Sequence, residues 1–263
     1  MIKAMYTSAT GMSAQQTVVD ATANNLANVN TTGFKRSQTD FQDLIYITRT
    51  PPGAEVTTSL TAPTGLQIGS GVRVAGTTKS FLVGDLENTG NALDLAIEGD
   101  GFFQVTLPNG QTRYTRDGAL RLNAQGNLVT TDGFLLSPQI TIPQDAQTIT
   151  VGADGTIAVL SASNPSTPSV VGSLQLVRFV NPAGLSSEGH NLYMQTNASG
   201  TAITTNPGLN GAGLIRQGFL ERSNVDVVSE LVHLILAQRA YEFNTKAIKV
   251  ADDMLSSANS LTQ

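Results

Sequence analysis

Apolar residues recur every seven positions near the N-terminus. The main row consists of Met5, Met12, Val19 and Leu26. A neighbouring row, three residues earlier, consists of Ile2, Ala9 and Ala23, with Gln16 as its one polar member. Two apolar rows at this spacing are typical of a coiled-coil seam. The pattern predicts a helix over residues 1–32, which Gly33 would end as a left-handed cap.

A longer stripe of the same kind occupies the C-terminal end of the chain. It consists of Val227, Leu234, Tyr241, Ile248 and Leu255. The rows beside it consist of Ala237, Ala251 and Ala258 on one flank and Ala247, Met254 and Leu261 on the other. Ser223 and Asp226 resemble a capping box, although Asp replaces the usual Glu or Gln. The sequence therefore predicts a helix over residues 223–263, about 60 Å long at about 1.5 Å per residue.

Each predicted helix carries an apolar stripe but has no core of its own. An isolated helix of this kind is marginal in water, so each needs a partner. The two helices could pair within the chain or with copies on neighbouring chains, and the pattern leaves both arrangements open. A stripe that covers the central domain is the usual arrangement for a single amphipathic helix. Because both terminal helices carry narrow heptad stripes, we favour helix–helix pairing.

The middle of the chain alternates apolar and polar residues in short runs. Leu93, Leu95 and Ile97 form one run, and Phe103, Val105 and Leu107 form the next. Turn signals such as Asn109-Gly110 separate the runs, as in an antiparallel meander or barrel. Segment 161–169 is rich in Ser, Asn and Pro and predicts a loop. We therefore predict an α+β fold, with long N- and C-terminal helices paired as a coiled coil and a central antiparallel β-rich domain.

These patterns divide the chain into three predicted parts. They are a helical coiled-coil domain over 1–32 and 223–263, an extended β and loop connector over 33–89, and a β-rich domain over 90–222. Within the connector, residues 50–71 form a long polar stretch punctuated by Pro51, Pro63, Gly65, Gly69 and Gly71. A loop of this length inside a compact domain is unusual, so we expect it to be functional or interfacial.

Composition and charge narrow the class of protein. The formal net charge of -5 provides no field that attracts phosphate backbones, so we expect no nucleic-acid partner. The chain has no cysteine, which excludes disulfides and thiolate chemistry. Its N-terminus lacks the long apolar segment of a cleavable signal peptide, and no run approaches the roughly 18 apolar residues of a membrane span. We expect no direct membrane insertion, and any export would not use the ordinary secretory route.

Candidate catalytic or metal-binding residues are few. Glu98 and Asp100 could be a carboxylate pair for glycoside hydrolysis, but an Asp in a Gly-Asp-Gly turn usually forms local hydrogen bonds. His190 and His233 lack a second ligand at zinc spacing. We expect no catalytic residue, no metal site and no cofactor.

Several longer segments resemble the flagellar rod and hook protein family. They run from Ala23 to Arg36 (ANNLANVNTTGFKR), from Leu93 to Phe103 (LDLAIEGDGFF), from Tyr114 to Gly118 (YTRDG), from Gly189 to Tyr193 (GHNLY), from Ser223 to Asp226 (SNVD) and from Gln238 to Glu242 (QRAYE). These matches keep their order and are spread over nearly the whole chain, so they are highly specific. The chain length and the segment from Gly65 to Val72 are most similar to the members that form the distal rod.

The resemblance implies a structural protein, not an enzyme, that self-assembles helically into a rigid hollow drive shaft. In this family the terminal helices form an inner coiled-coil tube and the β-rich domain forms an outer layer. The two main heptad rows would then be the assembly interface, and residues 46–75 would set the stiffness of the rod. The implied partners are further copies of the chain, proximal rod proteins, the hook protein, the surrounding basal-body ring proteins and the flagellar export apparatus. The implied location is the basal-body rod that crosses the periplasm and carries torque from motor to hook.

Two alternative functions remain: another protein of the flagellar axis, or a protein of a different functional class. A hook or proximal-rod protein would share both ends of the chain, but the size of the middle and the 50–71 stretch argue against it. A secreted carbohydrate-active β protein would use Glu98, and the sequence gives it no positive support.

Overall fold

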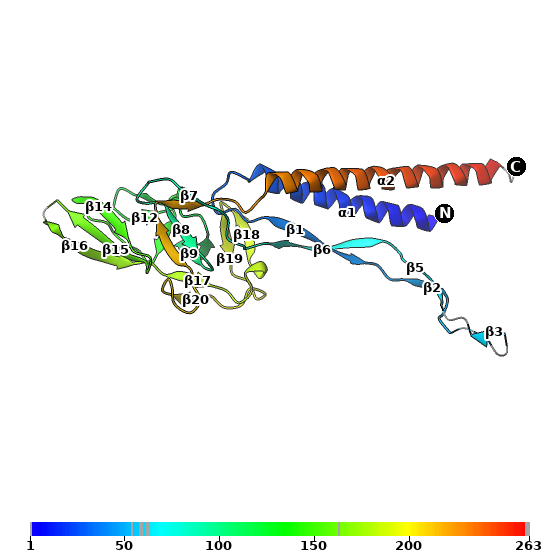
Figure 1. Ribbon diagram of the computed structural model, residues 1–263, viewed down its shortest axis with the longest axis horizontal. Helices are drawn as coiled ribbons and strands as arrows, with labels where there is room; N and C mark the ends of the chain where they lie inside the picture. Colours follow the sequence, from blue (N-terminus) through cyan, green and yellow to red (C-terminus); the bar gives the residue numbers. More distant parts are fainter. Residues whose placement is uncertain (1, 54, 58–59, 62–63, 163, 261–263) are drawn as a thin grey trace. The chain divides into compact units, whose positions relative to one another are not determined.

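The computed structural model describes residues 2–53, 55–57, 60–61, 64–162 and 164–260 (Figure 1). The chain forms two compact units, each built from separate stretches of sequence. The helical unit comprises Met1–Leu26, Ser37–Thr78 and Asp226–Gln263, and the β unit comprises Ala27–Arg36 and Lys79–Val225. No helix among the described residues combines the length and apolarity needed to cross a membrane.

Two antiparallel helices, α1 (Ile2–Ala27) and α2 (Val227–Ser260), run side by side in the helical unit (Figure 1). Asn25 near the end of α1 is hydrogen-bonded to Glu230 near the start of α2, over 3.3 Å. Fourteen residues back along α1, a Cβ on Gly11 would lie 2.9 Å from the side-chain nitrogen of Asn244. Glycine thus permits close approach of the helices at that point, and the predicted pairing occurs within the chain.

The predicted helix boundaries were wrong by several residues. α1 ends at Ala27 and not at residue 32, because the chain then enters turns in which the Thr31 N–H donates to the Asn28 carbonyl. Gly33 is left-handed, with φ of +67°, but it does not cap the helix. A Cβ there would lie 2.7 Å from the backbone nitrogen of Asp117, so this position requires glycine for a close backbone contact.

The start of α2 is also different from the prediction. The helix begins at Val227, and the Asp226 carboxylate accepts the N–H groups of Val228 (2.8 Å) and Ser229 (3.2 Å). Asp226 is therefore the N-cap residue, as expected for a short side chain that accepts from the first turn. The Ser223 hydroxyl accepts from Val225 at 3.3 Å, so the predicted capping box is not formed.

A strand ladder occupies most of the Ser37–Thr78 stretch of the helical unit. β1 (Ser37–Asp43) pairs with β6 (Val72–Lys79), β2 (Ile47–Thr50) with β5 (Leu66–Ile68), and β3 (Glu55–Thr57) with β4 (Leu60–Thr61). We predicted a long loop over the polar 50–71 stretch. The structure shows instead that this stretch contains paired strands. Every residue of β2 and β5 is exposed, so no buried face leaves an alternating apolar pattern in the sequence.

The largest sheet of the β unit has nine strands and antiparallel pairing throughout. Its main path has the order β11-β12-β13-β9-β10-β19-β18, and β17 pairs with both β9 and β20. The strands are β9 (Phe102–Thr106), β10 (Thr112–Thr115), β11 (Arg121–Leu122), β12 (Leu128–Val129), β13 (Leu135–Ser137), β17 (Leu176–Arg178), β18 (Ser186–Gly189), β19 (Leu192–Met194) and β20 (Ile203–Thr205). The predicted antiparallel β-rich region is confirmed.

Smaller sheets complete the β unit. They are formed by β14 (Ala146–Val151), β15 (Thr156–Ser161) and β16 (Asn164–Ser173), by β8 (Leu95–Glu98) with β21 (Leu214–Gln217), and by β7 (Leu86–Asn88) with β22 (Phe219–Glu221). A short 3-10 helix spans Pro182–Gly184. The predicted loop at 161–169 was wrong, because most of it belongs to β16. This strand pairs on one side only, with β15, so an edge position accommodates Pro168.

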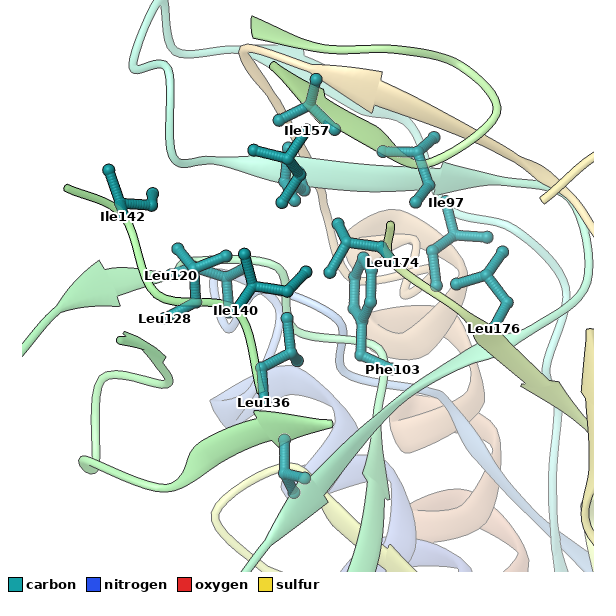
Figure 2. Packing of buried hydrophobic residues seen from close by; sticks show 14 of the residues in the cluster. Ile97, Phe103, Leu120, Leu128, Leu136, Ile140, Ile142, Ile157, Leu174 and Leu176 are labelled. Carbon is teal, nitrogen blue, oxygen red and sulfur yellow. The ribbon is translucent and has the colours of Figure 1, made fainter. Parts of the chain in front are cut away.

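The core of the β unit lies between these sheets. Ile97, Phe103, Leu136, Leu174 and Leu176 are among the buried side chains that pack together there (Figure 2). A second cluster is aromatic: the ring of Phe179 meets those of Phe102 and Tyr114 edge to face, with centroids 5.8 and 4.8 Å apart. Phe102 and Phe103 are thus both buried, on opposite faces of β9, which gives this strand a core on each side.

Candidate assembly surfaces

The predicted heptad row of α1 lies partly buried along the helix pair. All four members, Met5, Met12, Val19 and Leu26, are of intermediate exposure. The Met12 sulfur lies 3.3 Å from the Thr245 hydroxyl of α2, and so the row borders the contact between the helices. The deepest positions of α1 are different residues: Ala14, Thr22 and Asn25.

The predicted row of α2 divides into two groups. Leu234, Ile248 and Leu255 are half-buried, whereas Val227 and Tyr241 are exposed. The most deeply buried residues of α2, Glu230, Ala237 and Ala251, lie on one heptad row that begins three positions after Val227. The seam of the helix pair therefore combines large aliphatic side chains with a row of small and polar ones.

A buried polar contact closes the seam where α1 ends and α2 begins. The Asn25 side chain exchanges two hydrogen bonds with the backbone of Ser37, each 2.9 Å long, and also donates to Glu230. Asn25 and Glu230 are each only 1% exposed. Asn25 thus connects α1, β1 and α2. Asn25 lies off the predicted heptad rows and was not predicted as an interface residue, although the Ala23–Arg36 motif contains it.

An apolar stripe, here called the outer stripe, covers the side of α2 opposite to the seam. Its members are Val228, Val232, Ile235, Leu236, Phe243 and Val250, all exposed. At about 100° per residue they lie on the other side of the helix from Ala237. A helix that is apolar on both sides is typical of one buried within a larger assembly. The strict heptad rows do not contain these residues, so this stripe was not predicted.

A groove of about 400 Å³ opens between α1 and α2. It is lined by Gln16, Val19, Gln238, Tyr241 and Glu242. Two of the predicted interface residues, Val19 and Tyr241, thus lie at an opening of the helix pair and remain accessible to a second chain.

The strand ladder carries a further exposed apolar surface, around the β2–β5 pair. It is formed by Ile45, Tyr46, Ile47, Leu66 and Ile68. Of the residues predicted to set the rod type, Pro51 precedes a turn and Pro63 lies outside the described residues. A Cβ on Gly65 would lie 2.7 Å from the Pro52 ring, and a Cβ on Gly69 would lie 3.4 Å from the Tyr46 ring.

Gly71 fixes this ladder against α1. Its φ of +112° is a conformation that side chains rarely adopt, and a Cβ there would collide with the Thr10 side chain. The next residue, Val72, donates its N–H to the Thr10 hydroxyl over 3.4 Å, and Lys3 donates to the Ile68 carbonyl over 3.2 Å. Glycine at position 71 therefore permits contact between α1 and the ladder.

The candidate catalytic residues are engaged in surface ion pairs. Glu98 accepts from Arg216 over 2.6 Å, and a carboxylate oxygen of Asp100 lies 3.7 Å from Arg178. His190 is exposed, with its Nδ1 3.3 Å from Asp132. Within the described part of the chain, no three His, Cys, Asp or Glu side chains converge to form a metal site.

The chain is similar to known flagellar proteins along its whole length. Three family models match it: "Flagella basal body rod protein" over residues 5–35, "Flagellar hook protein FlgE/F/G D1 domain" over 96–159, and "Flagellar basal body rod FlgEFG protein C-terminal" over 216–261. These matches include nearly all of α1, part of the β unit and the whole of α2.

Curated relatives agree with the family models. The flagellar basal-body rod protein FlgG of Buchnera aphidicola is 46% identical over 261 residues, covering 99% of this chain and 100% of the relative. FlgG of Borreliella burgdorferi is 45% identical, covering 99% of each chain, and FlgG of Bacillus subtilis is 37% identical, covering 97% of each. The chain therefore belongs to the flagellar rod and hook protein family, as a structural rod protein of the flagellar basal body.

Proposed function

We propose that this protein is the distal-rod subunit, which self-assembles helically into a rigid hollow shaft that transmits torque from motor to hook. The observation that supports self-assembly most directly is the outer stripe of α2. One side of this helix already packs on α1, while the opposite side exposes large apolar residues such as Ile235 and Phe243. Copies of the same chain would cover them.

Burial of the outer stripe supplies the driving force for assembly. Each large apolar side chain contributes about 1.5–3 kcal/mol when it passes from full exposure to full burial. Leu236 and Phe243 are 61% and 66% exposed, so most of that contribution is still available in the single chain. A contact between two different surfaces does not close on itself and generates a helical polymer.

The predicted interface residues take complementary parts in this proposal. Leu234, Ile248 and Leu255, together with Met5, Met12 and Leu26, hold the helix pair together. Val19 and Tyr241 border the groove, and Val227 is exposed at the start of α2, so these three are available to neighbouring copies.

The ladder is our candidate for the segment that sets rod stiffness. Its exposed Tyr46 and Leu66 would pack on a neighbouring copy, while Thr10 and Gly71 hold its base against α1. A paired ladder resists bending better than a single strand, because both backbones are cross-linked by hydrogen bonds.

The remaining partners follow from a place in the distal rod. We expect proximal rod proteins at one end, the hook protein at the other, ring proteins around the shaft, and delivery by the flagellar export apparatus. We also propose that the protein has no enzymatic activity. The ion pairs of Glu98 and Asp100 support this, because they give both carboxylates a structural role on the surface.

Ile235→Asp tests self-assembly through the outer stripe. We expect the purified full chain to keep its β unit but to form no polymer, because the contact would have to bury a charge. Val170→Asp is the matched control, since Val170 is similarly exposed on β16 of the β unit. Normal polymer and normal motility with Ile235→Asp would contradict the proposal.

A further inference from the structure

The chain passes between the two units at four points: after Leu26, after Arg36, before Lys79 and after Val225. Three segments of the β unit, here called the exit segments, lie next to the last three of these points: residues 33–36, 79–84 and 221–224. All three contribute to one buried polar cluster inside the β unit. Its members are separated by up to about 190 positions in sequence, and so heptad and strand patterns gave no sign of it.

Glu221 is at the centre of this cluster. Its carboxylate accepts from the Lys35 ammonium at 2.5 Å and from the Gly84 N–H at 3.0 Å, and it lies 3.3 Å from Nε of Arg116. Its backbone carbonyl accepts the Gly33 N–H at 2.8 Å. The side chains of Lys35 and Glu221 are 0% exposed, and that of Arg116 is 2% exposed. One carboxylate thus joins all three exit segments to a buried arginine.

The two cations extend the cluster in different directions. Arg116 donates to the Gly99 and Gly101 carbonyls, both at 2.8 Å, and its guanidinium lies over the Phe102 ring at 5.7 Å. Lys35 donates to the Leu82 carbonyl at 2.7 Å. Burial lowers the pKa of Lys35, whereas the charge of Glu221 raises it. Arg116 therefore connects the cluster to the core, and Lys35 connects it to the second exit segment.

Asn224 adds a second set of cross-links among the same segments. Its side-chain nitrogen donates to the carbonyls of Ser80 (2.9 Å) and Leu82 (3.1 Å), and its oxygen accepts the Arg36 N–H (2.8 Å). The Ser80 N–H in turn donates to the Arg36 carbonyl at 2.9 Å. Each exit segment is thus hydrogen-bonded to the other two.

Stability alone does not account for such an arrangement. Buried ion pairs contribute little net stability, because desolvation offsets their attraction, and apolar side chains of similar volume often serve as well. Buried polar groups that bind one another do hold their members in one specific arrangement. In this cluster Nε of Arg116 and Oε2 of Glu221 are joined as an ion pair without a hydrogen bond, and the other contacts are hydrogen bonds. That property is useful at the points where load on the helical unit reaches the β unit along the chain.

We propose that Lys35, Arg116, Glu221 and Asn224 form a mechanical joint that holds the exit segments together under torsional load. The inference rests on the proposed function as a torque-transmitting rod subunit. A pull on one exit segment would be shared with the other two through Glu221 and Asn224, and with the core through Arg116. No single segment would then be peeled from the β unit.

Asn224→Ala tests the joint without changing any charge. In hydrogen exchange on the purified full chain, we expect the Arg36 amide, which loses its acceptor, to exchange about tenfold faster, as for the loss of one ordinary hydrogen bond. The Ser80 amide keeps its bond to the Arg36 carbonyl but loses the Asn224 cross-link beside it, so it should also exchange faster. The amide of Val105, deep in the core, should be unchanged. The matched control is Asn181→Ala, which removes a 3.0 Å hydrogen bond to the Ala198 carbonyl elsewhere in the β unit.

Motors of cells that carry each variant as their only copy supply the functional readout. We expect Asn224→Ala cells to build rods in normal number and to rotate small beads at normal speed, but to lose at least half of the speed with large beads. Glu221→Gln should show the same load-dependent loss, because it leaves two buried cations without their carboxylate.

Three results would overturn the joint. They are unchanged exchange at Arg36 and Ser80, a load response equal to that of the Asn181→Ala control, or an absence of rods, which would make the cluster a requirement for assembly instead. Failure of the proposed function would be distinct, since the wild-type chain itself would then form no polymer.

Discussion

Asn25→Asp replaces one side-chain nitrogen by an oxygen at the buried contact between α1, β1 and α2. In the wild-type chain that nitrogen lies 3.3 Å from a carboxylate oxygen of Glu230, and both residues are 1% exposed. The substitution would place two carboxylates at about that separation. It would also remove the donor to the Ser37 carbonyl, while keeping an acceptor for the Ser37 N–H.

The size of the effect follows from two competing costs. Two unit charges 3.3 Å apart repel by about 5 kcal/mol at an effective dielectric constant of about 20. The folded variant can instead take up one proton, which costs about 4 kcal/mol at pH 7 for a carboxyl group with an ordinary pKa near 4. We therefore expect a loss of about 4 kcal/mol in the stability of the helical unit at pH 7.

The pH dependence has a definite sign. Because the folded variant binds one proton more than the unfolded variant, its deficit should shrink by about 1.4 kcal/mol for each pH unit of acidification, until the pH nears about 4. Urea unfolding of the purified full chain, followed by far-UV circular dichroism, measures this. Gln16→Glu is the matched control, because it also replaces an amide by a carboxylate, at an exposed position of α1. Equal stability of the two variants, or a deficit independent of pH, would refute the reasoning.

Two further predictions concern the ladder and the β unit. Gly71→Ala should lower the stability of the helical unit by about 1–3 kcal/mol through the positive φ of this position alone. The amides of Val72 and Leu44 should then exchange faster. Gly76→Ala is the control: a Cβ there meets nothing within 4 Å, so both amides should be unchanged. Asp117→Asn should raise the thermal midpoint of unfolding at pH 7. Burial raises the pKa of the Asp117 carboxyl, so the folded wild-type chain binds a proton there more tightly than the unfolded chain does. The stability that this proton contributes is lost as the pH rises through the folded pKa. The amide can still accept from Thr32 and Ala119, so stability of the variant should depend less on pH above about 4, and an unchanged midpoint and pH profile would contradict this.

The sequence predicted the two terminal helices because their heptad rows are long and uninterrupted. It did not locate their ends, which depend on single hydrogen bonds such as those of Asp226 with the first turn of α2. Runs such as Leu95 and Ile97, or Phe103 and Val105, correctly predicted buried strands. β2, β5 and β16 were missed, because their residues are largely polar or exposed and leave no periodic signal.

The surfaces that carry the functional proposals were less predictable. Heptad rows that include Leu234 and Ile248 predict the seam. The outer stripe is identified as a second surface only by the structure, in which α1 packs on the opposite side of α2. The contacts of Asn25 with Glu230, and of Lys35 with Glu221, join residues about 200 positions apart. A single sequence contains no periodicity that links such residues.

The most direct test of assembly through the helices is segment-resolved hydrogen exchange on the chain as a dilute monomer and as a polymer. Assembly predicts that the outer-stripe segment, 228–250, exchanges much more slowly in the polymer, while the core strands β8 and β9 exchange equally slowly in both states. If residues 228–250 exchange at the same rate in both states, the outer stripe is not an assembly surface and the account is contradicted.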